Sequence, residues 1–284
     1  MPTPKPKRQM ARGSCTLCGK EFSKNKIAAH LDQCWTKLTA KEKHDGRALA
    51  PTRFFRLLIE GREEPKYWLH LDVRADATLE DLDDFLRRFW LECCGHLSAF
   101  TISDTRYRWE PPGGFDGDDF FDSLDDVFGM PREVRMDITL AETLSPGLHF
   151  EYEYDFGDTT ELKLHVLSEH EEPTRRKNLL VLARNEPLVS PCLECGQPAD
   201  WIGTYGDSYE TRTICDACTE KKGFGDAQLL PLVNSPRTGV CAYTGVLEDE
   251  DGNPPRRLLR PSRPCSQGLG SGYHGRVGGK ETVS

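Results

Sequence analysis

The order of apolar and polar positions predicts an α+β core in the middle of the chain. Residues 54–60 and 67–74 alternate in polarity around the turn-forming segment 61–65, which is typical of a β-hairpin. Further strands are expected within 97–109, at the start of 134–144, and at 148–155, 160–168 and 178–184. Strands joined mainly by hairpins predict an antiparallel sheet.

One long helix is expected to cover one face of this sheet. Thr78-Leu79-Glu80-Asp81 has the form of a capping box, which marks the start of a helix. Gly95 is the expected end, because glycine readily adopts the left-handed conformation of a helix C-cap. Between them, apolar side chains recur at helical spacing: Leu79, Leu82, Phe85, Leu86, Phe89 and Trp90.

A first metal-binding motif, Cys15-x2-Cys18-x11-His30-x3-Cys34, precedes the core. A Cys-x2-Cys turn supplies two zinc ligands, while His30 and Cys34, four residues apart, share one face of a helix. The spacing predicts a structural zinc site in a finger of the C2HC type.

A second motif, Cys192-x2-Cys195-x19-Cys215-x2-Cys218, follows the core. Two knuckles at this separation are typical of a four-cysteine zinc ribbon. Four thiolates leave no open position for water, so a closed site of this kind is structural rather than catalytic. The sequence therefore predicts two structural Zn²⁺ sites, which stabilise modules too small to fold on apolar burial alone.

The composition fits a globular protein without membrane contact. Of 284 residues, 37% are hydrophobic and 29% charged, and no apolar run approaches the roughly 18 residues of a membrane helix. Residues 1–12 are rich in Pro, Lys and Arg and lack the apolar stretch of a signal peptide. We therefore expect a cytoplasmic protein, in which paired cysteines bind metal rather than form disulfides.

The net charge of −9 is unevenly distributed. Residues 1–47 carry 11 Lys and Arg against 4 Asp and Glu, whereas residues 48–191 carry 16 against 30. A basic segment attracts phosphate backbones and an acidic body repels them. Nucleic-acid contact is therefore expected within residues 1–47, with Lys20, Lys24 and Lys26 as candidate ligands for phosphate. The alternative is that the basic end only improves solubility.

Sequence-specific reading of DNA by the finger is not favoured. By analogy with DNA-reading fingers, the base-facing positions are Ser23, Lys26 and Ala29, and alanine offers no hydrogen bond. One finger also buries too little surface for tight specific binding. Non-specific contact with phosphates and contact with a protein both stay open.

The segment from Tyr152 to Asp158 (Tyr-Glu-Tyr-Asp-Phe-Gly-Asp) ends a strand with a glycine turn. Gly157 permits positive φ, and Asp155 or Asp158 can accept hydrogen bonds from turn amides. The residues expected to define this motif are Tyr152, Tyr154, Asp155, Phe156, Gly157 and Asp158.

On this motif the chain resembles the plasmid pRiA4b ORF-3-like family, also labelled as TnpR-like passenger proteins of insertion sequences. The resemblance covers residues 50–185, and the ribbon with residues 234–241 resembles a zinc-ribbon-containing branch, to which an N-terminal C2HC finger is added. Thr160 and Leu162 stand where many members have Trp and His. The resemblance implies an α+β fold and a mobile-element context more than an activity.

Catalysis has weaker support than binding. The Asp residues of 116–126 could hold a cation, but they lack the EF-hand order, and the acidic segment 113–126 is more typical of a solvated loop. Asp155 and Asp158, near the Tyr-Asp-Phe-Gly-Asp turn, are more typical of turn residues than of metal ligands.

The remaining cysteines give no catalytic pattern. Cys93 and Cys94, beside His96, are interpreted as buried thiols at a helix end that faces the core. Cys241 and Cys265 are interpreted as lone thiols without a motif.

The predicted organisation is a basic tail (1–13), the C2HC finger with its connector (14–47), the α+β domain (48–189), the ribbon (190–222), an ordered irregular segment (223–246) and a disordered tail (247–284). The expected fold is thus an antiparallel sheet with a helix on one face, flanked by two zinc modules. The expected function is non-enzymatic binding of zinc, with docking on nucleic acid through the finger. The alternatives are a protein-interaction adaptor that uses the acidic domain and, with less support, a metal-dependent enzyme.

Overall fold

The computed structural model describes residues 12–42, 51–109, 133–173, 178–204, 211–222 and 229–245. The acidic loop at 113–126, residues 1–11 and the tail at 247–284 lie outside the described residues. Within the described residues, no helix combines the length and the apolar character that crossing a membrane requires.

The strands and helices of these residues form two sheets with few helices. The strands are β1 (Arg12–Cys15), β2 (Glu21–Ser23), β3 (Pro51–Gly61), β4 (Trp68–Arg74), β5 (Ser98–Ile102), β6 (Thr105–Arg108), β7 (Glu133–Arg135), β8 (His149–Tyr154), β9 (Thr160–Pro173), β10 (Leu179–Asn185), β11 (Trp201–Thr204), β12 (Thr211–Ile214) and β13 (Leu229–Pro231). The helices are α1 (Lys24–Glu42), α2 (Leu79–Leu86), the π-helix η2 (Arg87–Leu91), α4 (Leu140–Thr143) and α5 (Asp216–Lys222).

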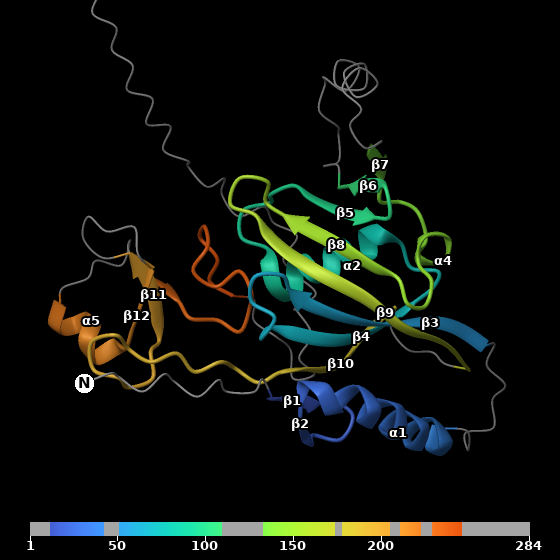
Figure 1. Ribbon diagram of the computed structural model, residues 1–284, viewed down its shortest axis with the longest axis horizontal. Coiled ribbons are helices and arrows are strands. Elements are labelled where there is room, and N and C mark those ends of the chain that lie inside the picture. Colours follow the sequence, from blue (N-terminus) through green and yellow to red (C-terminus); the bar gives the residue numbers. More distant parts are fainter. Residues whose placement is uncertain are drawn as a thin grey trace, which may run out of the picture.

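The large sheet confirms the predicted α+β class. Its ten strands lie in the order β2-β1-β10-β4-β3-β9-β8-β5-β6-β7 (Figure 1), and all neighbours are antiparallel except β6 and β7. The predicted hairpins are confirmed, since β3 pairs with β4 and β8 pairs with β9. The segment 97–109 differs from the single predicted strand, because the turn at Ser103, with φ of 53°, divides it into β5 and β6.

Strand β4 shows how this sheet is buried on both faces. Its side chains alternate, so that Leu69, Leu71 and Val73 belong to the main apolar core together with α2 and η2. Trp68 points to the other face, where it packs with residues of β1, β10 and α1. β4 nevertheless lacks the continuous apolar run that is typical of such strands, because the polar side chains of His70 and Asp72 are buried as well.

The helix after β4 begins as predicted but ends earlier. The capping box at Thr78 is present, because the Thr78 side chain accepts from the amide of Asp81 and the Asp81 carboxylate accepts from the amide of Thr78. The α-helix has only eight residues and continues as the five-residue η2, in which the Glu92 amide donates to the Arg87 carbonyl at 2.8 Å. The expectation that Gly95 caps the helix is wrong, since the helical chain ends at Leu91 and Gly95 lies in the turn beyond it.

The finger is part of the large sheet rather than a flanking module. Its strand β1 pairs with β10, with Gly13 opposite Asn185, and its helix α1 runs beside the sheet in Figure 1. The apolar face of α1 packs on the sheet through Ile27, Leu31 and Trp35. The predicted tail boundary at residue 13 is corrected as well, because β1 already begins at Arg12.

A charged network joins the finger to the second face of the sheet. Arg56 of β3 donates two hydrogen bonds to Asp72 of β4, at 2.8 and 3.0 Å, and one to Asp32 of α1, at 2.7 Å. His170 of β9 lies 3.3 Å from Asp72. Burial alone would raise the pKa of Asp72, but the hydrogen bonds from His170 and Arg56 lower it below its ordinary value.

We expect Gly13→Ala to destabilise the protein by about 1–3 kcal/mol, because an added methyl group overpacks the joint between β1 and β10. A Cβ at Gly13 would lie 2.1 Å from the Arg184 carbonyl oxygen and 2.4 Å from the Trp68 ring. Denaturant unfolding measures the loss. Gly157→Ala is the matched control, since its Cβ meets only Asp155, at 3.4 Å; equal stability of the two variants would contradict the packing.

We expect Asp72→Asn to cost about 3–5 kcal/mol, because it leaves the buried Arg56 without its carboxylate. Asp76→Asn, which removes the exposed partner of Arg74, is the control and should cost less than about 1 kcal/mol. The stability that Asp72 provides is present above its unfolded pKa of about 3.9 and is lost as pH falls through its lower folded pKa. Between neutral and acid pH, the free energy of unfolding of Asp72→Asn should therefore fall less than that of the unsubstituted chain. The same pH dependence in both proteins would contradict the assignment.

Candidate metal centres

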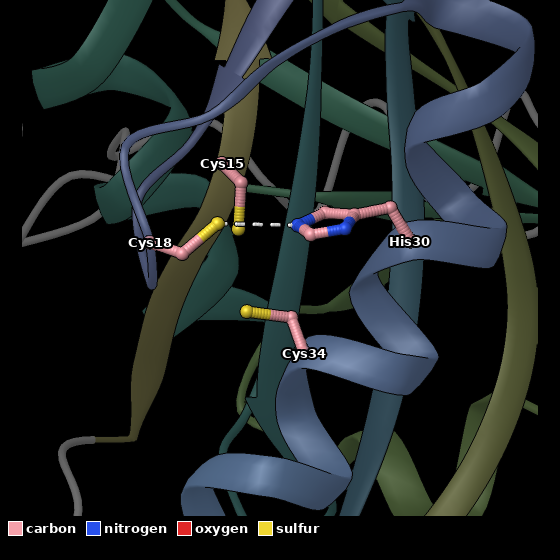
Figure 2. A group of neighbouring side chains, drawn as sticks. All are labelled: Cys15, Cys18, His30 and Cys34. Carbon is pink, nitrogen blue, oxygen red and sulfur yellow. Dashed lines mark hydrogen bonds between the residues drawn. The ribbon is translucent and has the colours of Figure 1, made fainter.

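The structure brings the four predicted finger ligands together. Cys15 ends β1, Cys18 lies in the following turn, and His30 and Cys34 project from adjacent turns of α1 (Figure 2). Their ligand atoms all lie within 4.8 Å of one another, with Cys18 Sγ 3.3 Å from His30 Nε2. The turn is closed by Gly19, with φ of 69°, whose amide donates to the Cys15 carbonyl at 2.8 Å.

The surroundings of the finger cluster shift the pKa values of its four ligands in different directions. The Phe22 ring stacks on His30 with centroids 4.0 Å apart, which fixes the imidazole. Burial lowers the pKa of His30, and the charges of Lys20 and Lys37 lower it further, so the ring is neutral and its nitrogen free to ligate at neutral pH. The pKa of Cys18 is lowered against the effect of burial, chiefly by the hydrogen bond from the Lys20 amide. Burial raises the pKa of Cys15 to about 12 and also raises the pKa of Cys34, so these two thiols need a bound cation to ionise at neutral pH.

The ribbon cysteines form a second cluster. Cys192 and Cys195 lie in a turn closed by Gly196, with φ of 75°, while Cys215 and Cys218 flank the start of α5. Their four sulfurs lie within 4.8 Å of one another, and those of Cys195 and Cys215 are 3.6 Å apart. The turns Cys15-x2-Cys18 and Cys192-x2-Cys195 thus each have a left-handed glycine directly after the second cysteine, whereas Cys218 is followed by Thr219 within α5.

The pKa values of the ribbon thiols are shifted in opposite directions. Burial opposes ionisation of Cys192, but hydrogen bonds from the amides of Cys215, Cys195 and Glu194 lower its pKa to about 6. The neighbouring cysteine side chains raise the pKa of Cys218 to about 12. A cation bound among the four sulfurs would remove this conflict, because it stabilises every thiolate at once.

A third cluster joins residues that the sequence analysis treated separately. Cys93, Cys94 and His96 follow η2, and Cys241 approaches them from the far end of the described chain. The interpretation of Cys93 and Cys94 as buried thiols is corrected, because both are only half-buried, and Cys241 is not a lone thiol. A separation of 145 residues between His96 and Cys241 hides this proximity from any local motif.

Cys241 is brought there by a segment that docks on the core. Arg237, fully buried, donates to Asp155 at 2.6 Å and to Thr160 at 3.0 Å. Ser235 donates to the Trp90 carbonyl at 2.6 Å. The predicted irregular segment at 223–246 therefore has two parts among its described residues: β13 completes the ribbon sheet, and residues 232–243 pack on the central domain.

The strand that ends in Asp155 organises these contacts. Tyr152 donates to the buried Asp83 at 2.7 Å, and Tyr154 donates to Glu92 at 3.0 Å. Asp155, with φ of 66°, accepts from the amides of Gly157 and Asp158 at 3.1 and 3.3 Å, which confirms its predicted turn role. Phe156, Gly157 and Asp158 are exposed, and Phe156 is a large apolar side chain with 42% exposure. Asp155, one of the carboxylates considered for a metal-dependent enzyme, thus already accepts hydrogen bonds from Arg237 and from the amides of its own turn.

The candidate phosphate-binding lysines differ in their surroundings. Lys20 and Lys26 are exposed. Lys24 instead forms an ion pair with Glu60 and donates to the Pro65 carbonyl at 2.7 Å. It fastens the start of α1 to the β3–β4 turn.

A family model matches the central part of the chain. The model of the family described as "Plasmid pRiA4b ORF-3-like protein" matches residues 55–193. Among solved structures, the protein of unknown function MM3350 from Methanosarcina mazei Go1 matches with 18% identity and a TM-score of 0.37, over 47% of this chain and 70% of that chain. No curated protein matches.

We expect Cys18→Ser and Cys195→Ser each to lose one equivalent of zinc, because each removes one of four ligands in a closed site. Elemental analysis of the purified proteins measures the loss, with Cys265→Ser, outside both motifs, as the control. Removal of zinc by a chelator should melt the affected module, since each structural zinc contributes on the order of 10 kcal/mol to folding. Full zinc content in either variant would contradict the assigned ligands.

Proposed function

We propose that this chain, which belongs to the plasmid pRiA4b ORF-3-like family by its match over residues 55–193, is a zinc-stabilised binding protein. In this proposal, its finger contacts the phosphates of a nucleic acid. The observation that carries the proposal is the solvent face of α1. Lys26, Ala29, Gln33 and Lys37 recur on it at helical spacing and are all exposed. The opposite face of the same helix is buried in the sheet.

The cations on this side of the finger are available to a partner. We call Lys20, Lys26 and Lys37 the basic face; none of them takes part in an ion pair found among the described residues. Lys20 and Lys37 lie close enough to His30 for their charges to lower its pKa, after the larger effect of burial. Their positive potentials therefore overlap around the zinc cluster, as a phosphate-binding surface requires.

The pairing of Lys24 changes its proposed role. Because Lys24 is neutralised by Glu60, it adds little to the potential of the basic face. We assign it to docking of the finger and assign phosphate contact to Lys20, Lys26 and Lys37. The basic face presents cations and an alanine rather than a set of base-reading donors, which supports contact with the backbone over sequence-specific recognition.

The charge of the whole chain supports confinement of binding to the finger. Residues 48–191 carry 16 Lys and Arg against 30 Asp and Glu and repel phosphate. A nucleic acid therefore gains attraction only where it lies along α1. This arrangement predicts modest affinity that depends steeply on salt, because counterion release supplies most of the binding free energy.

The test compares the zinc-loaded full chain with a Lys20→Gln/Lys26→Gln/Lys37→Gln variant on labelled duplex DNA and structured RNA across salt. Loss of three phosphate contacts should reduce the slope of log affinity against log salt by about three. Lys66→Gln, which removes an exposed lysine paired with Glu64, is the matched control and should leave the slope unchanged.

Two outcomes would overturn this function. If the full chain binds neither nucleic acid at low salt, the basic face has another role, and a protein partner for the acidic domain becomes the better reading. If the triple variant binds as tightly as the unsubstituted chain, another surface makes the contact.

A further inference from the structure

The cluster of Cys93, Cys94, His96 and Cys241 has the dimensions of a metal site. Its four ligand atoms lie within 4.8 Å of one another. The Sγ atoms of Cys94 and Cys241 are 3.6 Å apart, and Cys241 Sγ is 3.6 Å from His96 Nε2. Tetrahedral zinc, with bonds of about 2.3 Å to sulfur and 2.0 Å to nitrogen, separates its ligands by about 3.5–3.8 Å.

The two motif-bearing clusters provide an internal standard for this geometry. The ribbon sulfurs Cys195 and Cys215 are also 3.6 Å apart, and the finger pair Cys18–His30 is 3.3 Å apart. All three clusters consist of four soft or borderline ligands, with the same three-sulfur, one-nitrogen set in the finger and here. The third cluster thus matches the other two in distances and in chemistry, although no local motif marks it.

The surroundings would stabilise a bound cation with three thiolates. Such a site has a net charge of −1, and Arg237 Nη2 donates a hydrogen bond to Cys93 Sγ at 3.5 Å, although the charge of Arg237 is already balanced by Asp155. Asp155 lies 3.4 Å from the same His96 Nε2, so this nitrogen contacts the carboxylate only while it does not ligate a metal. Arg237 also pairs with Asp155, so both partners are fixed before a metal arrives.

We propose that Cys93, Cys94, His96 and Cys241 bind a third zinc ion, which fastens residues 232–243 to the end of η2. Three ligands come from the turn after η2, and the fourth comes from the segment that returns from the ribbon. Cys241 itself has φ of 53°, a conformation that costs energy for a residue other than glycine and that aims its sulfur at the cluster.

A metal at this place has a structural consequence. The segment 232–243 is held by Arg237 and Ser235 at one end, and Cys241 is its second attachment near the other end. Closing a chain loop of more than a hundred residues by a metal removes conformational entropy from the unfolded chain. The third zinc therefore fixes residues 232–243, which follow the ribbon and include the buried Arg237, against the turn at Asp155.

A disulfide is the main rival for these thiols. The 3.6 Å between Cys94 and Cys241 far exceeds the S–S bond of about 2.05 Å, and such a bond would leave Cys93 and His96 without a role. The chemistry also differs in what it releases: zinc binding releases the protons of three thiols, whereas a disulfide needs an oxidant to accept two electrons. Mass measurement of the unreduced protein separates the two.

The decisive experiment is the zinc content of the full chain, purified under reducing conditions and freed of loosely bound metal on a chelating resin. We expect three equivalents per chain. Cys94→Ser and Cys241→Ser should each retain two, whereas Cys265→Ser should retain three. With cobalt in place of zinc, the thiolate-to-metal absorption should fall by about three tenths in Cys241→Ser, since the site provides three of ten thiolates.

Two equivalents in the unsubstituted chain would overturn the proposal, whether or not any variant folds. Three equivalents that persist in both Cys94→Ser and Cys241→Ser would overturn it as well, because the third metal would then lie elsewhere. A Cys94–Cys241 disulfide in the protein as purified would assign these thiols to redox chemistry instead. Circular dichroism of each variant checks that a lost equivalent does not reflect global unfolding.

Discussion

The pairing of β10 on both of its edges is the constraint on which the rest of the molecule depends. One edge pairs with β4 of the central domain and the other with β1 of the finger. The sheet has two faces that must be buried, and helix α1 of the finger covers the face that is opposite the main core. A small finger usually owes its fold to its metal. Here the Cys15/Cys18/His30/Cys34 cluster, which could hold a metal, the sheet pairing and the buried Arg56 network all involve the finger, so their contributions to stability should be strongly coupled.

The segment from Tyr152 to Asp158 acts as an anchor, and this gives a physical reason for its residue types. Tyr152 and Tyr154 reach Asp83 and Glu92 of the α2–η2 region through their hydroxyl groups. Asp155 adopts a left-handed conformation that it tolerates because its carboxylate binds its own turn amides. The same carboxylate receives Arg237 from the C-terminal segment. A motif that could suggest an active site thus joins three parts of the chain.

Local chemistry determined which features the sequence could predict. The hairpins, the capping box at Thr78 and the two cysteine motifs are encoded within short stretches, and the structure has them where they were expected. Contacts between distant segments were not accessible: neither β1 with β10 nor Cys94 with Cys241 leaves a periodic or spaced pattern. The π-helix η2 was not predicted, because the spacing of its apolar residues is also compatible with an α-helix. What distinguishes it is the hydrogen bond from the Glu92 amide to the Arg87 carbonyl. The paired state of Lys24 depends on Glu60, which lies 36 residues away.

If the finger contacts nucleic acid as proposed, its fusion to the sheet limits the way in which it can approach a duplex. A reading finger inserts its helix into a major groove about 12 Å wide, so groups on both flanks of the helix must clear the duplex. In this chain, Ile27, Leu31 and Trp35 are committed to the sheet, and Lys24 at the start of α1 is tied to Glu60. Insertion would bring the acidic body against the phosphates. A duplex laid along the basic face avoids that repulsion, which favours contact with the backbone alone.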